Sequence, residues 1–438
     1  MAERMGVLRR VLADARLRRV ELAFFGFGAA EYGVWVAVLV YAYERGGTTA
    51  SAVMAALQLL PAALVAPFAA VIADRRGGAV ALRIGYLAQA LSIGGSAVAM
   101  LLAAPPAAVW AGAIVAASAV TLTRPAQLAL LPALVDTPVE LTAANVVSGW
   151  VESVSMLVGP AAAGLMMALA GPGAALALYA GVTALGAVLV TPLARSPAAV
   201  RSAAGIERPA TPLAVMRIIA RDPRITSALA IVIVEFVAIG ALDVLAVVLA
   251  INVLGLGAGA AGYLGAAFGA GGVLGAMLAL ALVGRQRVSG ALLGAALAWG
   301  AAFVAIGAWP AAAAAFALLG ACGMSRAVLD VAARTMLHRV VPAPLHGRVF
   351  GVLESLTMLG LAIGSLSVPA LVALAGAEAA WVGIGLLLVL VALAAMRTLS
   401  ALDRDPSLEA VTGSRSVHRA APELVARRLE TSEASRVG

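Results

Sequence analysis

Long apolar stretches, interrupted only by short groups of Gly, Pro and Arg, make up most of this chain. About 20 apolar residues in a helix are enough to cross the ~30 Å hydrocarbon layer of a bilayer. The pattern therefore predicts twelve membrane-spanning helices in two sets of six. The first set covers residues 20–43, 50–73, 80–103, 107–131, 143–170 and 173–194, and the second covers residues 225–253, 258–283, 289–309, 311–338, 349–376 and 379–398.

One long polar insertion separates the two sets of helices and carries six arginines. The short N-terminal arm places apolar side chains beside an arginine face, which is typical of a helix lying on a membrane surface. The C-terminal tail mixes charges with Ser, Thr and Pro, and we expect it to be flexible. The expected segments are an arm at 1–19, a six-helix bundle at 20–194, a basic linker at 195–224, a second six-helix bundle at 225–398 and a tail at 399–438.

The composition excludes a soluble globule. Of the 438 residues, 63% are hydrophobic and only 12% are charged. Short alternating segments typical of an outer-membrane barrel are missing, so helices are the expected way to satisfy the backbone hydrogen bonds within a bilayer. The expected fold class is an all-α membrane protein with two pseudo-symmetric six-helix bundles. A single cysteine, Cys322, excludes a disulfide within the chain.

The charges are distributed unevenly between the two sides of the expected membrane. The net charge is +8, from 30 basic and 22 acidic residues, and most arginines flank the same ends of the apolar stretches. Because cytoplasmic loops are enriched in basic residues, both termini are expected in the cytoplasm and the chain in the cytoplasmic (inner) membrane. Short arginine groups in such loops are typical of contact with anionic lipid, so the lipid bilayer is an expected partner and nucleic acid is not.

The two halves of the chain carry related sequences. At an offset of 210 residues, Arg124 coincides with Arg334 and Pro132 with Pro342, and residues 149–157 match 351–359 at an offset of 202. Six crossings return the chain to its starting side, so both halves run in the same direction. The repeat therefore predicts a pseudo-twofold axis along the membrane normal, with the substrate path between the bundles.

Five acidic residues lie inside the predicted spans, where a charge costs about 2.5 to 3.5 kcal/mol even on the lenient insertion scale. They are Glu31, Glu152, Glu235, Asp243 and Glu354. A carboxylate that alternates between a closed and a wetted site can load and release a proton. The alternative is that these acids neutralise buried arginines or bond neighbouring helices. The proton interpretation requires that they reach a central cleft and are not all locked to arginines.

Other intramembrane side chains have more than one interpretation. Arg124 can hold an anionic group of a substrate, pair with a carboxylate, or extend to the inner surface. Arg326 and Asp330 lie four residues apart, so we expect them to pair along their helix, and the alternative is a role in proton coupling or in the substrate cavity. Tyr32 and Trp35 can stack on a planar ligand or pack between helices. No metal-ligand cluster, phosphate-binding loop or activated nucleophile is recognisable, so neither a cofactor nor an enzymatic activity is expected.

The loop after the second predicted helix carries a motif. Asp74, Arg75 and Gly77 match the core of Gly-x-Leu-Ala-Asp-Arg-x-Gly, although Ala70 replaces its first Gly and residues 78–79 replace its following basic pair. With the two sets of six helices, this motif makes residues 15–398 resemble the major facilitator superfamily. The resemblance implies a cytoplasmic gate in which Asp74 and the arginines clip the halves together in the outward-facing state.

A second motif bears on the direction of transport. Gly159 and Pro160, followed by Gly164, are similar to the helix-5 motif of facilitator antiporters, which implies export and a gating role for Gly159 and Pro160. In the same way, stretches 124–160 and 334–350 resemble the branch that includes enterobactin exporters and macrolide efflux proteins. A glycine-rich stretch that contains Gly265 and Gly269 in small-xxx-small spacing is expected to permit close helix packing.

Together these features lead to the hypothesis of a proton-coupled antiporter. It would export a small amphipathic molecule, such as a drug, siderophore or secondary metabolite, by alternating access, with protons as the second partner. A facilitator that imports a small nutrient is the nearest alternative, and a membrane-embedded enzyme or receptor is a remote one. The family resemblance implies a monomer.

Overall fold

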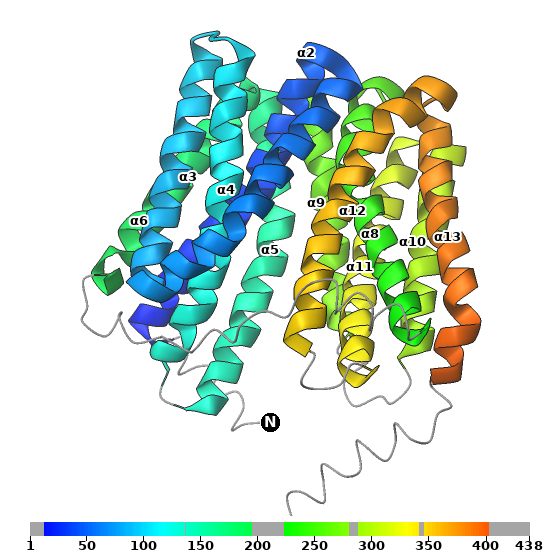
Figure 1. The fold of residues 1–438 in the computed structure, drawn as a ribbon. Coiled ribbons are helices and arrows are strands. Elements are labelled where there is room, and N and C mark those ends of the chain that lie inside the picture. Colours follow the sequence, from blue (N-terminus) through cyan, green and yellow to red (C-terminus); the bar gives the residue numbers. More distant parts are fainter. Residues whose placement is uncertain (1–12, 136, 195–222, 280–287, 341–345, 403–438) are drawn as a thin grey trace, which may run out of the picture.

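The computed structural model is all-helical and describes residues 13–135, 137–194, 223–279, 288–340 and 346–402 (Figure 1). Within these residues, eleven helices are long and apolar enough to cross a membrane. Most of the predicted linker and tail, and residues 1–12 of the predicted arm, lie outside the described residues.

The helices follow the predicted order. Those of the first half are α2 (Ala15–Arg76), α3 (Gly78–Leu101), α4 (Pro106–Leu130), α5 (Pro138–Ala170) and α6 (Pro172–Ala194). Those of the second half are α8 (Pro223–Val248), α9 (Ala258–Ala279), α10 (Ser289–Ala308), α11 (Ala312–Val340), α12 (His346–Ala375) and α13 (Ala377–Leu402). Short irregular turns extend α4 as η1 (Leu131–Ala133) and α8 as η3 (Leu249–Val253).

The first element, α2, contains two of the predicted crossings. Its 62 residues would measure ~93 Å as one helix, about three times the hydrocarbon thickness. Gly46 and Gly47 break the helix with non-helical dihedral angles, and Gly47 has φ +61°, a conformation that glycine adopts without strain. The break falls between the predicted helices 20–43 and 50–73, so the described chain crosses twelve times, in two bundles of six helices.

Local signals explain where several helices begin. Thr137 accepts a hydrogen bond from the backbone N–H of Glu140 at 3.2 Å and so caps α5, while Pro138 occupies the first helical position. Gly77, with φ +82°, separates α2 from α3. The motif glycine is thus required by the backbone at this sharp junction, because a side chain would be strained there.

The two ends of the molecule differ in how the bundles meet. We call the end that carries the Gly46–Gly47 break the hairpin end, at the top of Figure 1, and the opposite end, where α2 begins, the terminal end. The bundles contact each other through α5 against α9 and α2 against α12. One apolar core joins both bundles, and its members from the first bundle lie toward the hairpin end, for example Val34, Ala163 and Met167.

A separate apolar core fills the terminal end of the first bundle. It contains Val20, Phe24, Phe27, Tyr86 and Leu130, and it does not extend into the second bundle. The bundles are therefore packed together at the hairpin end, whereas at the terminal end the first bundle has an apolar core of its own.

Candidate functional site

Three charged side chains from three helices of the first bundle meet in one cluster. Arg124 on α4 places Nη2 2.8 Å from Oε2 of Glu31 on α2, and Nη1 2.7 Å from Oε1 of Glu152 on α5. Both contacts are short, charge-assisted hydrogen bonds. Of the three roles considered for Arg124, the structure has it paired with carboxylates. We call Glu31, Arg124 and Glu152 the arginine triad.

The close approach of α2 and α5 brings the two acids within reach of one arginine. A Cβ on Gly159 would lie 2.5 Å from the carbonyl oxygen of Ala29, so only glycine fits where these helices touch. One turn before it on α5, Ser155 donates a hydrogen bond to the carbonyl of Phe25 at 3.1 Å. The seam between α2 and α5 therefore fixes the spacing of the two carboxylates that Arg124 bridges.

The arginine triad carries an unbalanced charge. With both acids ionised, two negative charges share one positive charge, which leaves a net charge of −1 in an apolar protein. The side chains of Glu31, Arg124 and Glu152 are 24%, 35% and 43% exposed, so the cluster is accessible from outside the protein. Binding one proton makes the triad neutral and lowers the cost of removing it from water.

The second bundle supplies a more deeply buried acid. Glu235 on α8 is 1% exposed, and its Oε2 has no hydrogen-bond partner within the described part of the chain. Arg326, Asp330 and Arg334 on α11 all act on it electrostatically. Glu235 is thus buried near arginines without being locked to one of them by an ion pair among the described residues.

Within the described part of the chain, polar contacts of Asp243 and Arg326 cross the boundary between the bundles. Asp243 on α8 accepts a hydrogen bond from the indole N–H of Trp35 on α2. On α11, Arg326 directs Nη1 to the sulfur of Met156 on α5 at 3.6 Å, while its Nε is buried and unpartnered within the described residues. Both contacts must change if the bundles move relative to each other.

The expected pair of Arg326 with Asp330 is wrong. Asp330 instead pairs with Arg334, one turn further along α11, with Nε 2.8 Å from Oδ1. Both arginines are four residues from Asp330, so helical spacing alone does not choose between them. Arg326 extends across the bundle boundary to Met156, which leaves Arg334 as the partner.

The remaining candidates fall in different places. Tyr32 is partly buried and within electrostatic range of both the arginine triad and Arg326. Glu354 lies on α12, but its side chain is outside the described part. The side chains of Asp74 and Arg75, at the end of α2, are also outside it, so the predicted gate clip stays a prediction.

The second motif lies where the two bundles touch. A Cβ on Gly262 of α9 would lie 2.5 Å from both the Cα of Gly164 and the carbonyl oxygen of Pro160 on α5. Further along α9, a Cβ on Gly269 would lie 2.3 Å from the carbonyl oxygen of Met156. Pro160 cannot donate a backbone hydrogen bond to that carbonyl. The glycine-rich stretch therefore packs directly on the Gly159–Pro160 segment.

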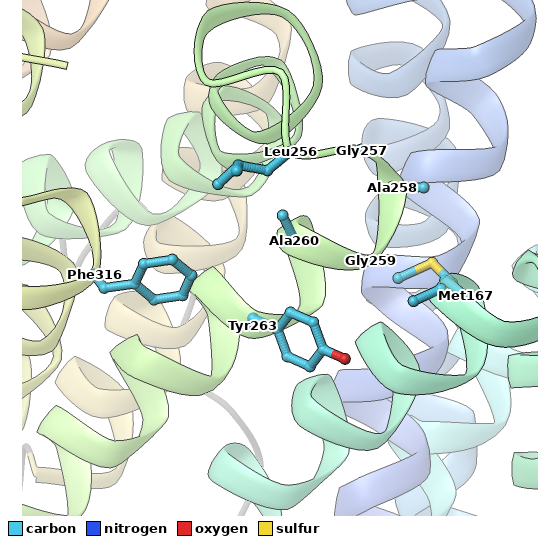
Figure 2. A pocket seen from close by; sticks show the side chains of 9 residues that line it. Met167, Leu256, Gly257, Ala258, Gly259, Ala260, Tyr263 and Phe316 are labelled. Carbon is cyan, nitrogen blue, oxygen red and sulfur yellow. The ribbon is translucent and has the colours of Figure 1, made fainter. Parts of the chain in front are cut away.

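A cavity of about 530 Å³ lies beside this contact at the hairpin end. Figure 2 shows Met167, Leu256, Tyr263 and Phe316 arranged around it. Met167 belongs to the first bundle and the other three to the second, so the cavity is lined by both halves. Its lining is largely apolar, and the phenol of Tyr263 is its only ionisable side chain.

Glu21 was not among the acids selected from the sequence. It occupies the second position of the predicted span 20–43, yet the residue is only 7% exposed. Ser148 on α5 donates a hydrogen bond to its Oε1 at 2.6 Å. The sequence feature that could have identified Glu21 is an acidic residue flanked by apolar residues, ten positions before Glu31.

Comparisons with known proteins agree on the fold. The sequence profile described as Major Facilitator Superfamily matches residues 20–327, which is more than two thirds of the chain. No curated protein matches the chain. A POT family transporter in complex with 5-aminolevulinic acid has a similar structure, with a TM-score of 0.70, 14% identity and coverage of 88% of this chain and 96% of that one.

The nucleoside transporter NupG also has a similar structure. Its TM-score is 0.66 with 13% identity, and the match covers 89% of this chain and 99% of that one. At such low identity, these likenesses concern the fold alone.

Proposed function

The chain belongs to the major facilitator superfamily, and we propose that it exports a small amphipathic molecule in exchange for protons. The family match and the apolar helices indicate a multi-pass membrane transporter rather than an enzyme. The single observation that carries the proposal is the sharing of Arg124 by two partly exposed carboxylates.

Charge counting supports the coupling. Closing the terminal end around a triad with a net charge of −1 would remove an uncompensated charge from water, which costs several kcal/mol. Either a cationic cargo or a proton on Glu31 or Glu152 makes the triad neutral, and closure then avoids most of this cost. In an exchange cycle, the cargo neutralises the triad when the terminal end closes, and a proton taken up on the opposite side neutralises it on the return and is released at the terminal end.

Residues of the second bundle form contacts that would break when the two bundles separate at the hairpin end. The hydrogen bond from Trp35 to Asp243 and the contact of Arg326 with Met156 both join the two halves. If the halves separate at the hairpin end, these bonds break and Asp243 and Arg326 become available to water or cargo. Glu235 is the candidate for a proton site in this bundle, because its Oε2 is buried without a hydrogen-bond partner among the described residues.

The nature of the cargo follows from the mixture of surfaces. The hairpin-end cavity offers apolar and aromatic walls, whereas the arginine triad offers charge. A molecule that passes both must have an apolar body and a polar or charged group. We place the terminal end in the cytoplasm, in keeping with the arginine distribution, and take the protein to act as a monomer in the inner membrane.

Transport into everted vesicles tests the proposal. Ethidium, a fluorescent amphipathic cation, serves as the probe, and its accumulation should collapse when a protonophore removes the proton gradient. Glu31→Gln and Glu152→Gln should each reduce proton-driven accumulation at least tenfold, whereas Glu44→Gln, an exposed acid at the hairpin end, should leave it unchanged. Accumulation that survives the protonophore would refute proton coupling.

The same preparation separates export from import. An exporter accumulates its cargo in everted vesicles, and a nutrient importer accumulates it in right-side-out vesicles. If ethidium accumulates only in right-side-out vesicles, the export proposal is wrong and the import alternative replaces it.

A further inference from the structure

A buried acid outside the arginine triad has no role in the mechanism described above. Glu21 lies on α2 toward the terminal end, and Ser148 on α5 donates to its Oε1 at 2.6 Å. Its Oε2 is buried and has no hydrogen-bond partner within the described part of the chain. The two oxygens of one carboxyl group are therefore in unlike environments, one hydrogen-bonded and one bare.

No described cation compensates Glu21. Ionisable residues near it on its own helix and on the helices packed around it include Arg16, Arg18, Arg19, Glu31, Arg83, Tyr86, Arg124, Glu140, Glu152 and Tyr179. Arg18 and Arg19 point to the exposed surface, and Arg124 is already held by two acids. None of the described arginines forms an ion pair with Glu21, while Tyr86 lies within its electrostatic range.

The surroundings of Glu21 are otherwise apolar. Its chain neighbours Val20 and Phe24 belong to the same apolar core as Tyr86, whose ring lies 6.0 Å from that of Phe27. An ionised carboxylate in such a place, with one donor and no cation, costs far more than a neutral carboxylic acid. The favoured form carries a hydrogen on Oε2 and a carbonyl at Oε1, where the Ser148 hydroxyl donates.

We propose that Glu21 is a second proton-binding site of this transporter, separate from the arginine triad and nearer to the terminal end. It binds one proton at Oε2 with Ser148 holding Oε1. Only the proton moves: the O–H bond of Glu21 breaks when the proton leaves, and the carboxylate keeps the electron pair. Its part in transport rests on the proposed function, but the binding of the proton does not.

The position of Ser148 connects this site to the triad. Ser148 and Glu152 lie four residues apart on α5 and share one face of the helix, about 6 Å apart along its axis. Both face α2, where they contact Glu21 and, through Arg124, Glu31. A proton that passes from Glu152 to Glu21 thus travels along the seam between α2 and α5, and Glu21 is the proton-binding residue nearest the terminal end.

A purely structural role makes a different prediction. In that case Glu21 would serve only to bond α2 to α5, and an amide would replace it without consequence, because the glutamine carbonyl still accepts from Ser148. Infrared spectroscopy of the purified full-length protein in lipid nanodiscs distinguishes the two roles. The C=O stretch of a protonated carboxyl group is well separated from the bands of a carboxylate.

Proton binding predicts three spectral results at neutral pH. Glu21→Gln should remove one protonated-carboxyl band, Ser148→Ala should shift that band to higher frequency because its carbonyl loses a donor, and Glu44→Gln should leave it unchanged. The band should survive in Glu31→Gln and Glu152→Gln. If Glu21→Gln fails to fold, the shift in Ser148→Ala, together with a frequency change in Glu21→Asp, tests the same assignment.

The assignment is overturned if no protonated-carboxyl band depends on Glu21 or Ser148. Proton counting then tests the transport role: Glu21→Gln should lower the number of protons exchanged per ethidium molecule by one. Ethidium-for-ethidium exchange should persist, since it moves no net proton. The infrared measurement needs neither cargo nor gradient. If the proposed export is wrong but Glu21 binds a proton, the band is still observed. If Glu21 binds no proton, the band is missing while proton-driven ethidium transport remains.

Discussion

Replacing Gly262 with alanine should push the two bundles apart at the hairpin end. Gly262 on α9 faces α5, and an added Cβ would lie 2.5 Å from the Cα and N of Gly164 and 2.5 Å from the carbonyl oxygen of Pro160. Ordinary contacts of a Cβ atom are 3.4–4 Å. All three obstructing atoms belong to the backbone, so they cannot rotate away as a flexible side chain would.

The expected size of the effect follows from this overlap. Restoring a normal contact requires a separation of about 1 Å, and overpacking of this kind costs about 1 to 3 kcal/mol. The cost falls on the conformation in which α5 and α9 are in contact. If the bundles separate there during alternating access, the equilibrium shifts toward the open conformation by about 5-fold to 150-fold.

Cysteine labelling measures this shift directly. Met167, which is 5% exposed and lines the hairpin-end cavity, is replaced by cysteine as the reporter. A membrane-impermeant maleimide added from the hairpin-end side should label Met167→Cys faster by the same factor when Gly262→Ala is present. The native Cys322 is fully buried, so it adds no background in the folded protein and becomes reactive only if the protein unfolds.

A matched glycine provides the control. Gly294 on α10 has no atom within 4 Å of an added Cβ, so Gly294→Ala should leave the labelling rate unchanged. Equal labelling of the reporter in Gly262→Ala and Gly294→Ala, with Cys322 unreactive in both, would show that the α5–α9 contact does not close the hairpin end.

Three smaller effects are expected elsewhere. Trp35→Phe removes the indole donor to Asp243, worth about 1 kcal/mol or more, and should raise labelling of the same reporter about fivefold or more. Asp330→Asn should change the free energy of unfolding by less than about 1 kcal/mol in thermal denaturation, because Asp330 and Arg334 are 42% and 53% exposed. Burial of Asp14 acts to raise its pKa, but hydrogen bonds from Arg16 and neighbouring backbone N–H groups lower the pKa overall. The stabilisation of the start of α2 by Asp14 is therefore complete above the ordinary aspartate pKa and is lost as the pH falls through the lowered value. Asp14→Ala should destabilise the start of α2 by about 1 kcal/mol at neutral pH and should have no effect in acid. Hydrogen exchange of the backbone amides at the start of α2 measures this difference.

The sequence was sufficient for the features that depend on local composition. The length and polarity of each apolar stretch located the spans, and the paired glycines at 46–47 fall in the gap that was expected between the first two. The close packing expected of the glycine-rich stretch is also present, with Gly269 against the backbone of α5. These features were accessible because helix length, backbone freedom and side-chain size are properties of short segments.

The partners of the charged residues were decided only by the tertiary structure. Arg124 bonds Glu31, 93 residues away, as well as Glu152, and no local pattern links these positions. Asp330 had an arginine one turn away on each side, and contact with α5 selected which one remained for it.

The burial of a charged side chain could not be predicted from the sequence either. Glu21 lies near the start of a span by position, yet Ser148 and the neighbouring helices bury it. Sequence periodicity fixes which residues share a face of one helix. The rotation and axial offset of each helix depend on how all twelve pack together, and these two quantities determine which charge meets which, and whether water reaches it.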